Sequence, residues 1–500
     1  MIGNIALGLS TAFAPYALAC SFAGVLLGNL IGVLPGVGAL ATISLLLPVT
    51  WKLDPTGALM MLAGIYYGAS FGGATTSILL NLPGTPSHAV VCVDGHPLAV
   101  KGRAGAAIFM AMFASFVGVC AGIVLMMLFS PLLVDLALLF GPAEYFSLMM
   151  AGLLAASTLG NRSILKGVAA VFIGLAFGVV GTDVNSGVVR FAFGLPDLMD
   201  GISLVALAMA LFGVCDILAN AGATDVGTFV RSRRIDRSAV RPGRGEMRQC
   251  SGPIARGSLI GSALGILPGV GGVMASFMSW AAEKAVSKQP QEFGRGAMAG
   301  VAGPEAANSS AAITAFIPTL ALGIPGDAIM ALMLGALMIH NIVPGPMLLT
   351  EHAAMFWGLI VSFWVGNLLL LLLNIPLIGI WVKLLSVPYR LIYPVVLFLV
   401  CVGVYSVNSN FFDVWEVLVL GVLGYLFAVL GFQPAPMIMG FVLGPLIEEN
   451  FRRALLLSHG DLSVFAVRPL SGAFLLAMVV MLVVVGLRNM RRRRRLAGSG

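Results

Sequence analysis

Two patches of small polar side chains, one in each half of the chain, have the composition of a binding site. The first is Thr75-Thr76-Ser77, followed closely by Asn81 and Thr85, and the second is Asn308-Ser309-Ser310. Hydroxyl and amide groups of this kind can coordinate Na⁺ and hydrogen-bond a carboxylate. We therefore interpret both patches, with Asn81 and Thr85, as substrate- or ion-binding residues.

A structural role is the alternative for all of these small residues. They let membrane helices approach closely, and Ser and Thr can bond to the backbone of their own helix. For Ser70 and Thr314, taken singly, we favour this alternative. For the two triplets we favour a site, because they lie at matching points of the two halves, beside breaks in the apolar runs.

Two acids lie in the otherwise uncharged region between Arg295 and Glu351, namely Glu305 and Asp327. An ionisable residue at membrane depth is expensive, and it marks a functional position by default. Either acid could coordinate a cation or relay a proton. The alternative is that they lie at an interface and are simply solvated.

The other polar residues near these segments are predicted to lie in loops or at interfaces. This applies to His88, His96 and His340, and to Arg103 and Arg295. For the two arginines the alternative is that one of them pairs with a substrate carboxylate.

A Gly/Pro break precedes each polar patch. The stretch Gly28–Leu40 reads GNLIGVLPGVGAL and returns 233 residues later as Gly261–Val273, GSALGILPGVGGV. A second P-G break follows each patch, and we place Ala302–Ala312 at the position of Gly68–Ser77. Proline removes a backbone donor and glycine permits positive φ, so helices should break here and present backbone groups beside the site. The predicted break residues are Pro35, Gly36, Pro83, Gly84, Pro268, Gly269, Pro325 and Gly326.

The composition sets the fold class. The chain has 500 residues, is 59% hydrophobic and only 10% charged, and carries no charge before Lys52. A membrane-spanning helix needs about 20 apolar residues. We predict an all-α polytopic membrane protein with about 10–12 transmembrane segments, in two structural repeats with broken or re-entrant helices. The residues leave open whether the repeats are inverted or parallel.

Basic residues concentrate next to apolar segments, in Arg231–Arg256 and Arg488–Arg495. The positive-inside rule assigns both to the cytoplasm, and this accounts for the net charge of +7 without nucleic acid. We expect a first transmembrane repeat at 1–221, a basic linker at 222–256, a second repeat at 257–487 and an Arg-rich tail at 488–500. No Lys or Arg precedes the first apolar run, so no cleaved signal peptide is expected.

The sequence lacks the motifs of several kinds of enzyme and metal site. The six cysteines are scattered, so neither a disulfide framework nor a structural metal site is expected. No G-x-x-x-x-G-K-[ST], H-E-x-x-H or G-x-S-x-G sequence occurs. No cofactor is expected beyond Na⁺ as a candidate coupling ion, and uphill transport would draw on an ion gradient or on another subunit.

Long motifs in both halves resemble one family. GVLPGVG, YYGASFGGATTSILLNLPGTPS, GILPGVGG and AGPEAANSS are similar to the large membrane subunit of the tripartite tricarboxylate transporters, TctA, from about Ala19 to Arg453. The resemblance implies a permease of the bacterial inner membrane that imports carboxylates such as citrate with Na⁺ or protons. It also implies inverted repeats, a small TctB-like membrane subunit and a TctC-like periplasmic solute-binding protein as partners.

Two other functions stay open on the residues. A stand-alone cation/carboxylate symporter would need no binding protein. An intramembrane enzyme or lipid-handling protein would need a nucleophile beside a base, and the patches offer Ser and Thr with no base next to them.

Overall fold

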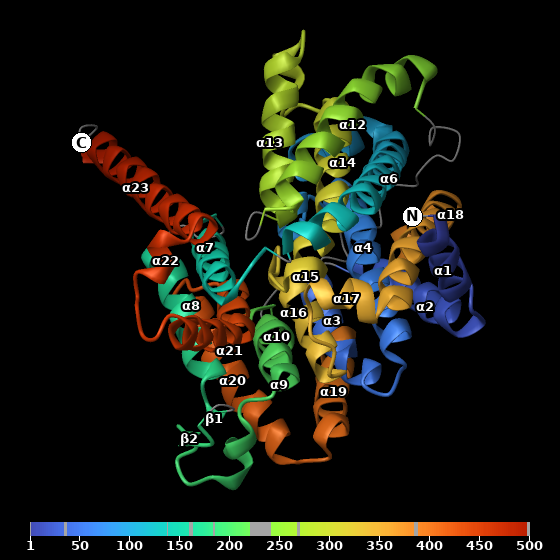
Figure 1. The fold of residues 1–500 in the computed structure, drawn as a ribbon. Coiled ribbons are helices and arrows are strands. Elements are labelled where there is room, and N and C mark those ends of the chain that lie inside the picture. The colour runs from blue at the N-terminus through green and yellow to red at the C-terminus, as the bar shows by residue number, and fades with distance from the viewer. Residues whose placement is uncertain are drawn as a thin grey trace. The chain divides into compact units, whose positions relative to one another are not determined.

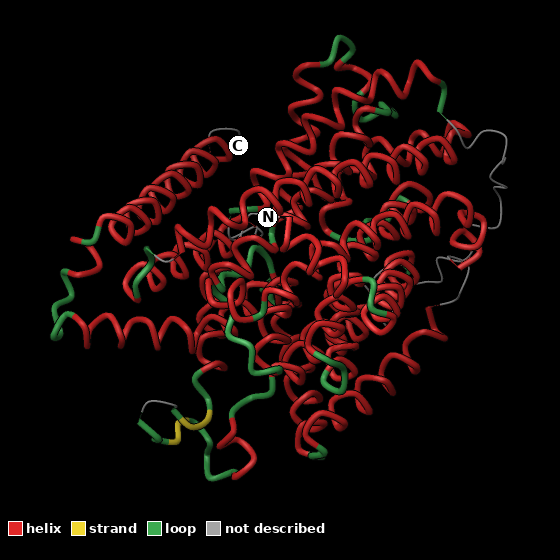
Figure 2. The backbone as a smooth tube through the Cα atoms, turned by 45° about the vertical axis from the view of Figure 1, so that its right-hand side comes forward, coloured by secondary structure: helices red, strands yellow, loops and turns green. Residues whose placement is uncertain are grey.

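Helices make up nearly all of the computed structural model (Figure 1). The structure describes residues 2–34, 38–137, 139–159, 164–183, 186–220, 242–267, 271–384 and 389–497. Figure 2 shows the strands of this part of the chain confined to one short hairpin. The predicted all-α fold is confirmed.

The described residues form two compact units, each built from separate stretches of chain. The first contains Met1–Val134 and Ser203–Val429, and the second contains Asp135–Ile202 and Leu430–Gly500. Both units take residues from each half of the sequence. The division into two sequence repeats, a linker and a tail stays a prediction.

Most helices begin in the first unit. They are α1 (Ile2–Ala12), α2 (Pro15–Val33), α3 (Gly38–Thr50), α4 (Pro55–Leu80), α5 (Ala89–Leu98), α6 (Ala104–Ala137), α9 (Leu204–Ala208), α10 (Cys215–Asn220), α12 (Arg244–Gly265), α13 (Gly271–Val286), α14 (Ala299–Thr314), α15 (Phe316–Leu322), α16 (Ala328–Ile339), α17 (Pro346–Glu351), α18 (Ala353–Leu384), α19 (Tyr389–Asn408) and α20 (Phe412–Val429). Two 3₁₀ turns, η1 (Pro86–His88) and η6 (Pro290–Glu292), and two π-helical turns, η2 (Ala99–Arg103) and η4 (Met209–Val214), complete it.

The second unit contains fewer elements. They are α7 (Pro142–Leu159), α8 (Ile164–Gly178), β1 (Gly181–Thr182), β2 (Val189–Arg190), the 3₁₀ turn η3 (Pro196–Asp200), α21 (Pro434–Leu457), α22 (Val464–Val467) and α23 (Pro469–Ala497). The strands pair antiparallel, with Gly181 opposite Arg190.

Four of the described helices are long and apolar enough to cross a membrane: Pro15–Val33, Pro86–Phe129, Ala353–Asn374 and Phe412–Val429. Six shorter apolar helices lie at Gly38–Thr50, Leu165–Gly178, Leu204–Ala219, Ala328–Ile339, Val396–Asn408 and Pro469–Val483. Short apolar helices are expected where Gly/Pro breaks divide a hydrophobic run. The count of 10–12 transmembrane segments stays a prediction.

Two helix pairs of the first unit are packed through glycine at every fourth position. Along α2, a Cβ added at Gly24, Gly28 or Gly32 would collide with the backbone of Met61, Ile65 or Ala69 in α4. Along α12, a Cβ at Gly257, Gly261 or Gly265 would collide with Gly303, Ala307 or Ala311 in α14. Small residues at this spacing allow backbones to touch, which drives helix association in lipid.

This packing places the second polar patch in a different register from the one predicted. Ala307 packs against Gly261 in the way that Ile65 packs against Gly28. By this packing Asn308 is equivalent to Tyr66 and not to the Thr75–Ser77 triplet. The extra residues of the second half lie between Gly271 and Gly303, where α13 is followed by the η6 turn. The predicted equivalence of Ala302–Ala312 and Gly68–Ser77 was therefore wrong, because it did not allow for the extra residues between Gly271 and Gly303.

Candidate functional site

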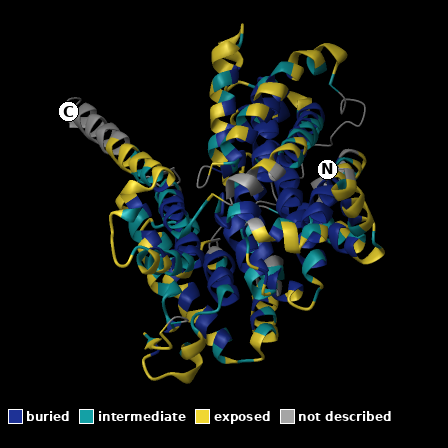
Figure 3. Cartoon of the chain, viewed as in Figure 1, coloured by how far each residue is buried: buried dark blue, intermediate teal, exposed yellow. Residues whose placement is uncertain are grey.

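The candidate site is built on two deeply buried helices of the first unit, α4 and α14. Figure 3 shows both mainly in dark blue, and all residues of α14 from Gly300 to Thr314 are buried. α4 begins after Asp54, whose carboxylate accepts a hydrogen bond from Thr56 N at 3.1 Å. With no polar face toward solvent, every polar side chain on these helices must find its partner inside the protein.

A hydrogen bond joins the two helices directly. Asn308 Nδ2 of α14 donates to Ser70 Oγ of α4 at 2.8 Å, and both side chains are less than 10% exposed. Asn308 Oδ1 faces the Cα of Gly272, in the first turn of α13, where an added Cβ would collide with it. Free backbone N–H groups at a helix N-terminus favour an anion. The predicted residue Asn308 thus lies between two helices and the start of a third.

The second cluster surrounds Glu305, one turn before Asn308 on α14. Its Oε2 accepts a hydrogen bond from Ser115 Oγ of α6 at 3.0 Å. Its Oε1 has no hydrogen-bond partner among the described residues and lies 3.6 Å from His88 Nε2, which also has none there. His88 Nδ1 contacts Thr85 Oγ1 at 2.6 Å, and Thr85 Oγ1 contacts Ser87 Oγ at 2.8 Å. Two predicted site residues, Glu305 and Thr85, are therefore connected through the imidazole.

Asp327 lies elsewhere, at the start of α16. Its Oδ1 accepts a hydrogen bond from Met330 N at 2.9 Å, which makes it the N-cap of this helix. Its Oδ2 accepts a hydrogen bond from Tyr66 Oη of α4 at 2.8 Å. Both carboxylate oxygens are engaged by protein groups.

The hydroxyl groups of the remaining predicted residues bond to backbone carbonyls or have no partner among the described residues. Thr76 Oγ1 donates to Val33 O at 2.6 Å and Ser77 Oγ to Gly73 O at 2.8 Å, and Thr75 is also buried. Ser310 Oγ donates to Ser258 O of α12 at 3.0 Å. Ser309 Oγ is buried and unbonded within the described part of the chain. The structure thus does not bring the Thr75–Ser77 triplet together with Asn308.

The helices break at the P-G positions that the structure describes. α4 ends at Leu80 with Asn81 exposed and left-handed at φ 57°, and α15 ends at Leu322 with Gly323 at φ 67°. Pro83, Gly84, Pro325 and Gly326 follow in non-helical backbone. Gly84 N donates to Ser77 Oγ at 3.2 Å, which ties the first break back to α4. Pro35, Gly36, Pro268 and Gly269 lie outside the described residues.

Sequence reasoning missed two members of the site and discounted a third. His88 was assigned to a loop or interface, yet it is 0% exposed. Its ring fits against Gly73, where a Cβ would approach it to 3.1 Å. Its position just after a P-G break was the available signal. Tyr66 carried no signal, and Ser70 was read as a packing residue.

A buried carboxylate outside the site holds the turn between α13 and α14. Asp94 Oδ1 of α5 accepts hydrogen bonds from Gly294 N, Gly296 N and Ala297 N at 2.8, 3.0 and 2.9 Å. Its Oδ2 accepts one from Trp280 Nε1 at 2.7 Å. Asp94 therefore connects a helix of the first half to the turn that precedes α14.

Arg103 and Arg295 are exposed, and Arg103 pairs with Glu246. Arg103 and Glu246 line a cavity of about 800 Å³ together with Arg256 and Glu283. Arg256 binds Glu283 through two hydrogen bonds, of 2.8 and 2.6 Å. The hydrogen bond to Glu283 raises the pKa of Arg256 above its ordinary value.

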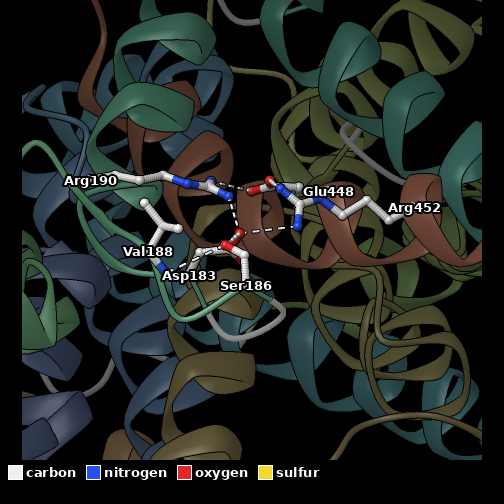
Figure 4. Close-up of polar contacts among 6 residues, drawn as sticks. All are labelled: Asp183, Ser186, Val188, Arg190, Glu448 and Arg452. Carbon is white, nitrogen blue, oxygen red and sulfur yellow. Dashed lines mark hydrogen bonds and ion pairs between the residues drawn. The ribbon is translucent and has the colours of Figure 1, made fainter.

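The second unit contains its own charged cluster, drawn in Figure 4. Asp183 Oδ2 accepts hydrogen bonds from Arg190, from Arg452 at 3.0 Å and from Ser186 at 2.6 Å. Glu448 of α21 binds Arg190 at 3.0 Å and Arg452 at 2.5 Å. The hydrogen bond to Glu448 raises the pKa of Arg190, so the guanidinium stays charged. These ion pairs attach the β1–β2 hairpin to α21, beside a cavity of about 350 Å³.

Comparison with known proteins decides the family. The sequence model of the tripartite tricarboxylate transporter TctA family matches residues 18–439. The chain belongs to the TctA family. As a TctA-family protein with several long apolar helices, it is a membrane protein of a transporter family, and the resemblance seen in the sequence is confirmed.

Two curated relatives come from Agrobacterium vitis. One, described as an uncharacterized 52.8 kDa protein in the TAR-I ttuC' 3' region, is 46% identical over 494 residues, covering 99% of this chain and 98% of its own length. The other, an uncharacterized protein in the TAR-II ttuC' 3' region, is 50% identical over 234 residues, covering 47% of this chain and 97% of its own. No solved structure matches the chain.

Proposed function

We propose that this TctA-family protein is the large permease subunit of a secondary transporter that imports carboxylates, citrate-like tricarboxylates among them, across a bacterial inner membrane. A Na⁺ or H⁺ gradient would drive the import. A TctC-like periplasmic binding protein would deliver the substrate, and a TctB-like small membrane subunit would complete the complex. The family match over residues 18–439 carries the proposal.

The arrangement around Asn308 supports a carboxylate as the cargo. The Asn308 amide and the Ser70 hydroxyl are already buried and hydrogen-bonded to each other. Exchanging this bond for bonds to a ligand therefore requires no further desolvation of either group. The unbonded hydroxyl of Ser309 adds a further donor on the same helix. Gly272 brings the first turn of α13 against Asn308, and a helix N-terminus stabilises negative charge.

The test is uptake into proteoliposomes that contain the chain together with its small membrane subunit. A thermal-shift screen of the cognate binding protein against di- and tricarboxylates chooses the substrate. Uptake of that labelled carboxylate is then measured with an imposed Na⁺ gradient, an imposed pH gradient, or neither, with and without the binding protein. We expect accumulation under one gradient only, and only when the binding protein is present.

The outcomes separate the alternatives. Equal accumulation without the binding protein would show a stand-alone symporter. No accumulation of any carboxylate under either gradient would contradict the proposed function and would leave a lipid-handling or enzymatic role to be tested.

A further inference from the structure

We propose that His88 and Glu305 form a proton-binding pair, and that the proton it takes up promotes binding of an anionic substrate at Asn308. The inference rests on the proposed transport function and names a coupling ion for it. It is carried by the geometry of two buried, facing side chains, each of which leaves one polar atom unbonded within the described residues.

The two unbonded atoms face each other. His88 Nε2 and Glu305 Oε1 lie 3.6 Å apart, and both side chains are 0% exposed. The other atom of each group is already engaged, because His88 Nδ1 contacts Thr85 Oγ1 and Glu305 Oε2 accepts from Ser115 Oγ. A buried polar atom without a partner is destabilising. A proton shared between Nε2 and Oε1 would satisfy both atoms with a small movement of either side chain.

Counting charges shows what one added proton does. With a neutral imidazole and an ionised carboxylate, the pair carries one negative charge in an apolar interior, which is costly. One added proton makes the pair neutral overall, as imidazole with carboxylic acid or as imidazolium with carboxylate. The two groups share that proton, so they titrate as a pair.

The surroundings fit a proton better than a metal ion. Na⁺ prefers several oxygen ligands, whereas the atom facing Glu305 Oε1 is an imidazole nitrogen. Among other groups close to Glu305, Cys92 of α5 is within electrostatic reach, and Ser115 of α6 donates its hydroxyl. Glu283 of α13 lies against Gly303 but is neutralised by Arg256. No described cation other than a protonated His88 faces the carboxylate.

The pair is positioned to sense the substrate. Glu305 and Asn308 are three residues apart on α14, so their side chains lie on the same face of the helix. The Asn308 partner, Ser70, lies on α4, and Gly73 of the same helix packs against the imidazole of His88. An ionised Glu305 would repel a carboxylate bound at Asn308, and the protonated pair would not. Substrate and proton should therefore bind together, by reciprocal linkage.

The sign of the pH effect follows from this linkage. Because the substrate binds best to the protonated pair, its apparent affinity should fall as the pH rises through the range in which the pair loses its proton. The limit for one linked proton is about tenfold weaker binding per pH unit. In the same range, binding should draw up to one proton from solution.

The experiment measures this proton directly on the purified membrane complex. Calorimetric titrations with citrate, in buffers of different ionisation enthalpy and from about pH 5.5 to 8.5, report the number of protons taken up on binding. Counterflow and pH-driven uptake of citrate are measured in proteoliposomes. The variants are Glu305→Gln, His88→Gln and, as a matched control, Glu144→Gln, which neutralises a buried carboxylate paired with Arg468 in the other unit.

For the wild type and the control we expect proton uptake that depends on pH. For Glu305→Gln we expect the proton uptake that comes from the pair to disappear, so that only the ionisation of citrate itself contributes, and pH-driven accumulation to be lost. If Glu305→Gln does not fold, His88→Gln replaces it, and the linked proton uptake must then shift along the pH axis. Linked proton uptake that is unchanged in either variant would overturn the proposal, even if the wild type transports carboxylates. A wild type that neither binds nor transports any carboxylate would instead overturn the proposed function.

Discussion

Tyr66 Oη donates a hydrogen bond of 2.8 Å to Asp327 Oδ2, across 261 positions of the sequence. The bond joins the middle of α4 to the first residue after the Pro325-Gly326 break, and so connects the candidate site to the start of α16. Asp327 is already held there by Met330 N. A hydroxyl from the first half thus orients the cap of a helix in the second.

Replacing this hydroxyl tests its contribution. Tyr66→Phe should destabilise the protein by about 1–3 kcal/mol, because a buried carboxylate oxygen loses its donor. Thermal unfolding in detergent measures the effect, and carboxylate uptake should fall as α16 loses its fixed start. Tyr145→Phe, which removes a hydroxyl from α7 in the other unit, is the control. Equal stability of the two variants would contradict the role assigned to Tyr66.

The Asn308–Ser70 bond yields a prediction about transport. Asn308→Ala and Ser309→Ala should reduce carboxylate uptake while membrane insertion and expression stay normal, because each removes a polar group of the proposed site. Ser362→Ala is the matched control, since its buried hydroxyl only donates to Leu359 O in its own helix. Normal uptake kinetics in both site variants would show that the substrate binds elsewhere.

Glycine packing between α12 and α14 gives a stability prediction. Gly261→Ala should destabilise the helix pair by about 1–3 kcal/mol, because the added methyl would meet the backbone of Ala307. Gly245→Ala lies on the same helix with nothing within 4 Å, and it should be neutral or slightly stabilising through helix propensity. Thermal unfolding of the two variants provides the comparison, and a stable Gly261→Ala protein would refute close backbone contact.

Asp94 should control the turn before α14. Asp94→Asn replaces a carboxylate that accepts three backbone N–H groups by an amide, which is a weaker acceptor. We expect a loss of stability of about 1.5–3 kcal/mol, the contribution of hydrogen bonds to a charged group. Amide hydrogen exchange at residues 294–297 should become faster. Glu292→Gln, at an exposed position of the same turn, should leave exchange unchanged. Slow exchange in Asp94→Asn would mean that other contacts hold this turn.

The hairpin of the second unit should depend on its ion pairs. Glu448→Gln removes the carboxylate that binds Arg190 and Arg452, so exchange at residues 186–190 should accelerate. Glu449→Gln breaks an exposed pair with Arg453 and should have little effect, because exposed ion pairs contribute about 0–1 kcal/mol. Similar exchange in both variants would show that backbone pairing alone holds the hairpin.

Composition and local pattern were sufficient for the helical class and for the described helix breaks, whereas the binding role of the polar patches stays a prediction. Long uncharged runs must form helices in lipid, and a Pro followed by Gly favours a break because it removes a backbone donor beside a flexible residue. The breaks at Pro83-Gly84 and Pro325-Gly326 follow from these local rules and are seen in the structure. The polarity of Asn308 and Glu305 inside an apolar run needed no tertiary information either.

The partners of these polar residues could not be read from the chain. A helix that is apolar all round has no preferred face, so its rotation, and hence the direction of each polar side chain, is set by the neighbouring helices. The glycine ridges of α2 and α12 fix that rotation for α4 and α14, and they place Asn308 at the position of Tyr66. The contact of His88 with Glu305 joins the η1 turn of the first half to α14 of the second, so no local pattern records it.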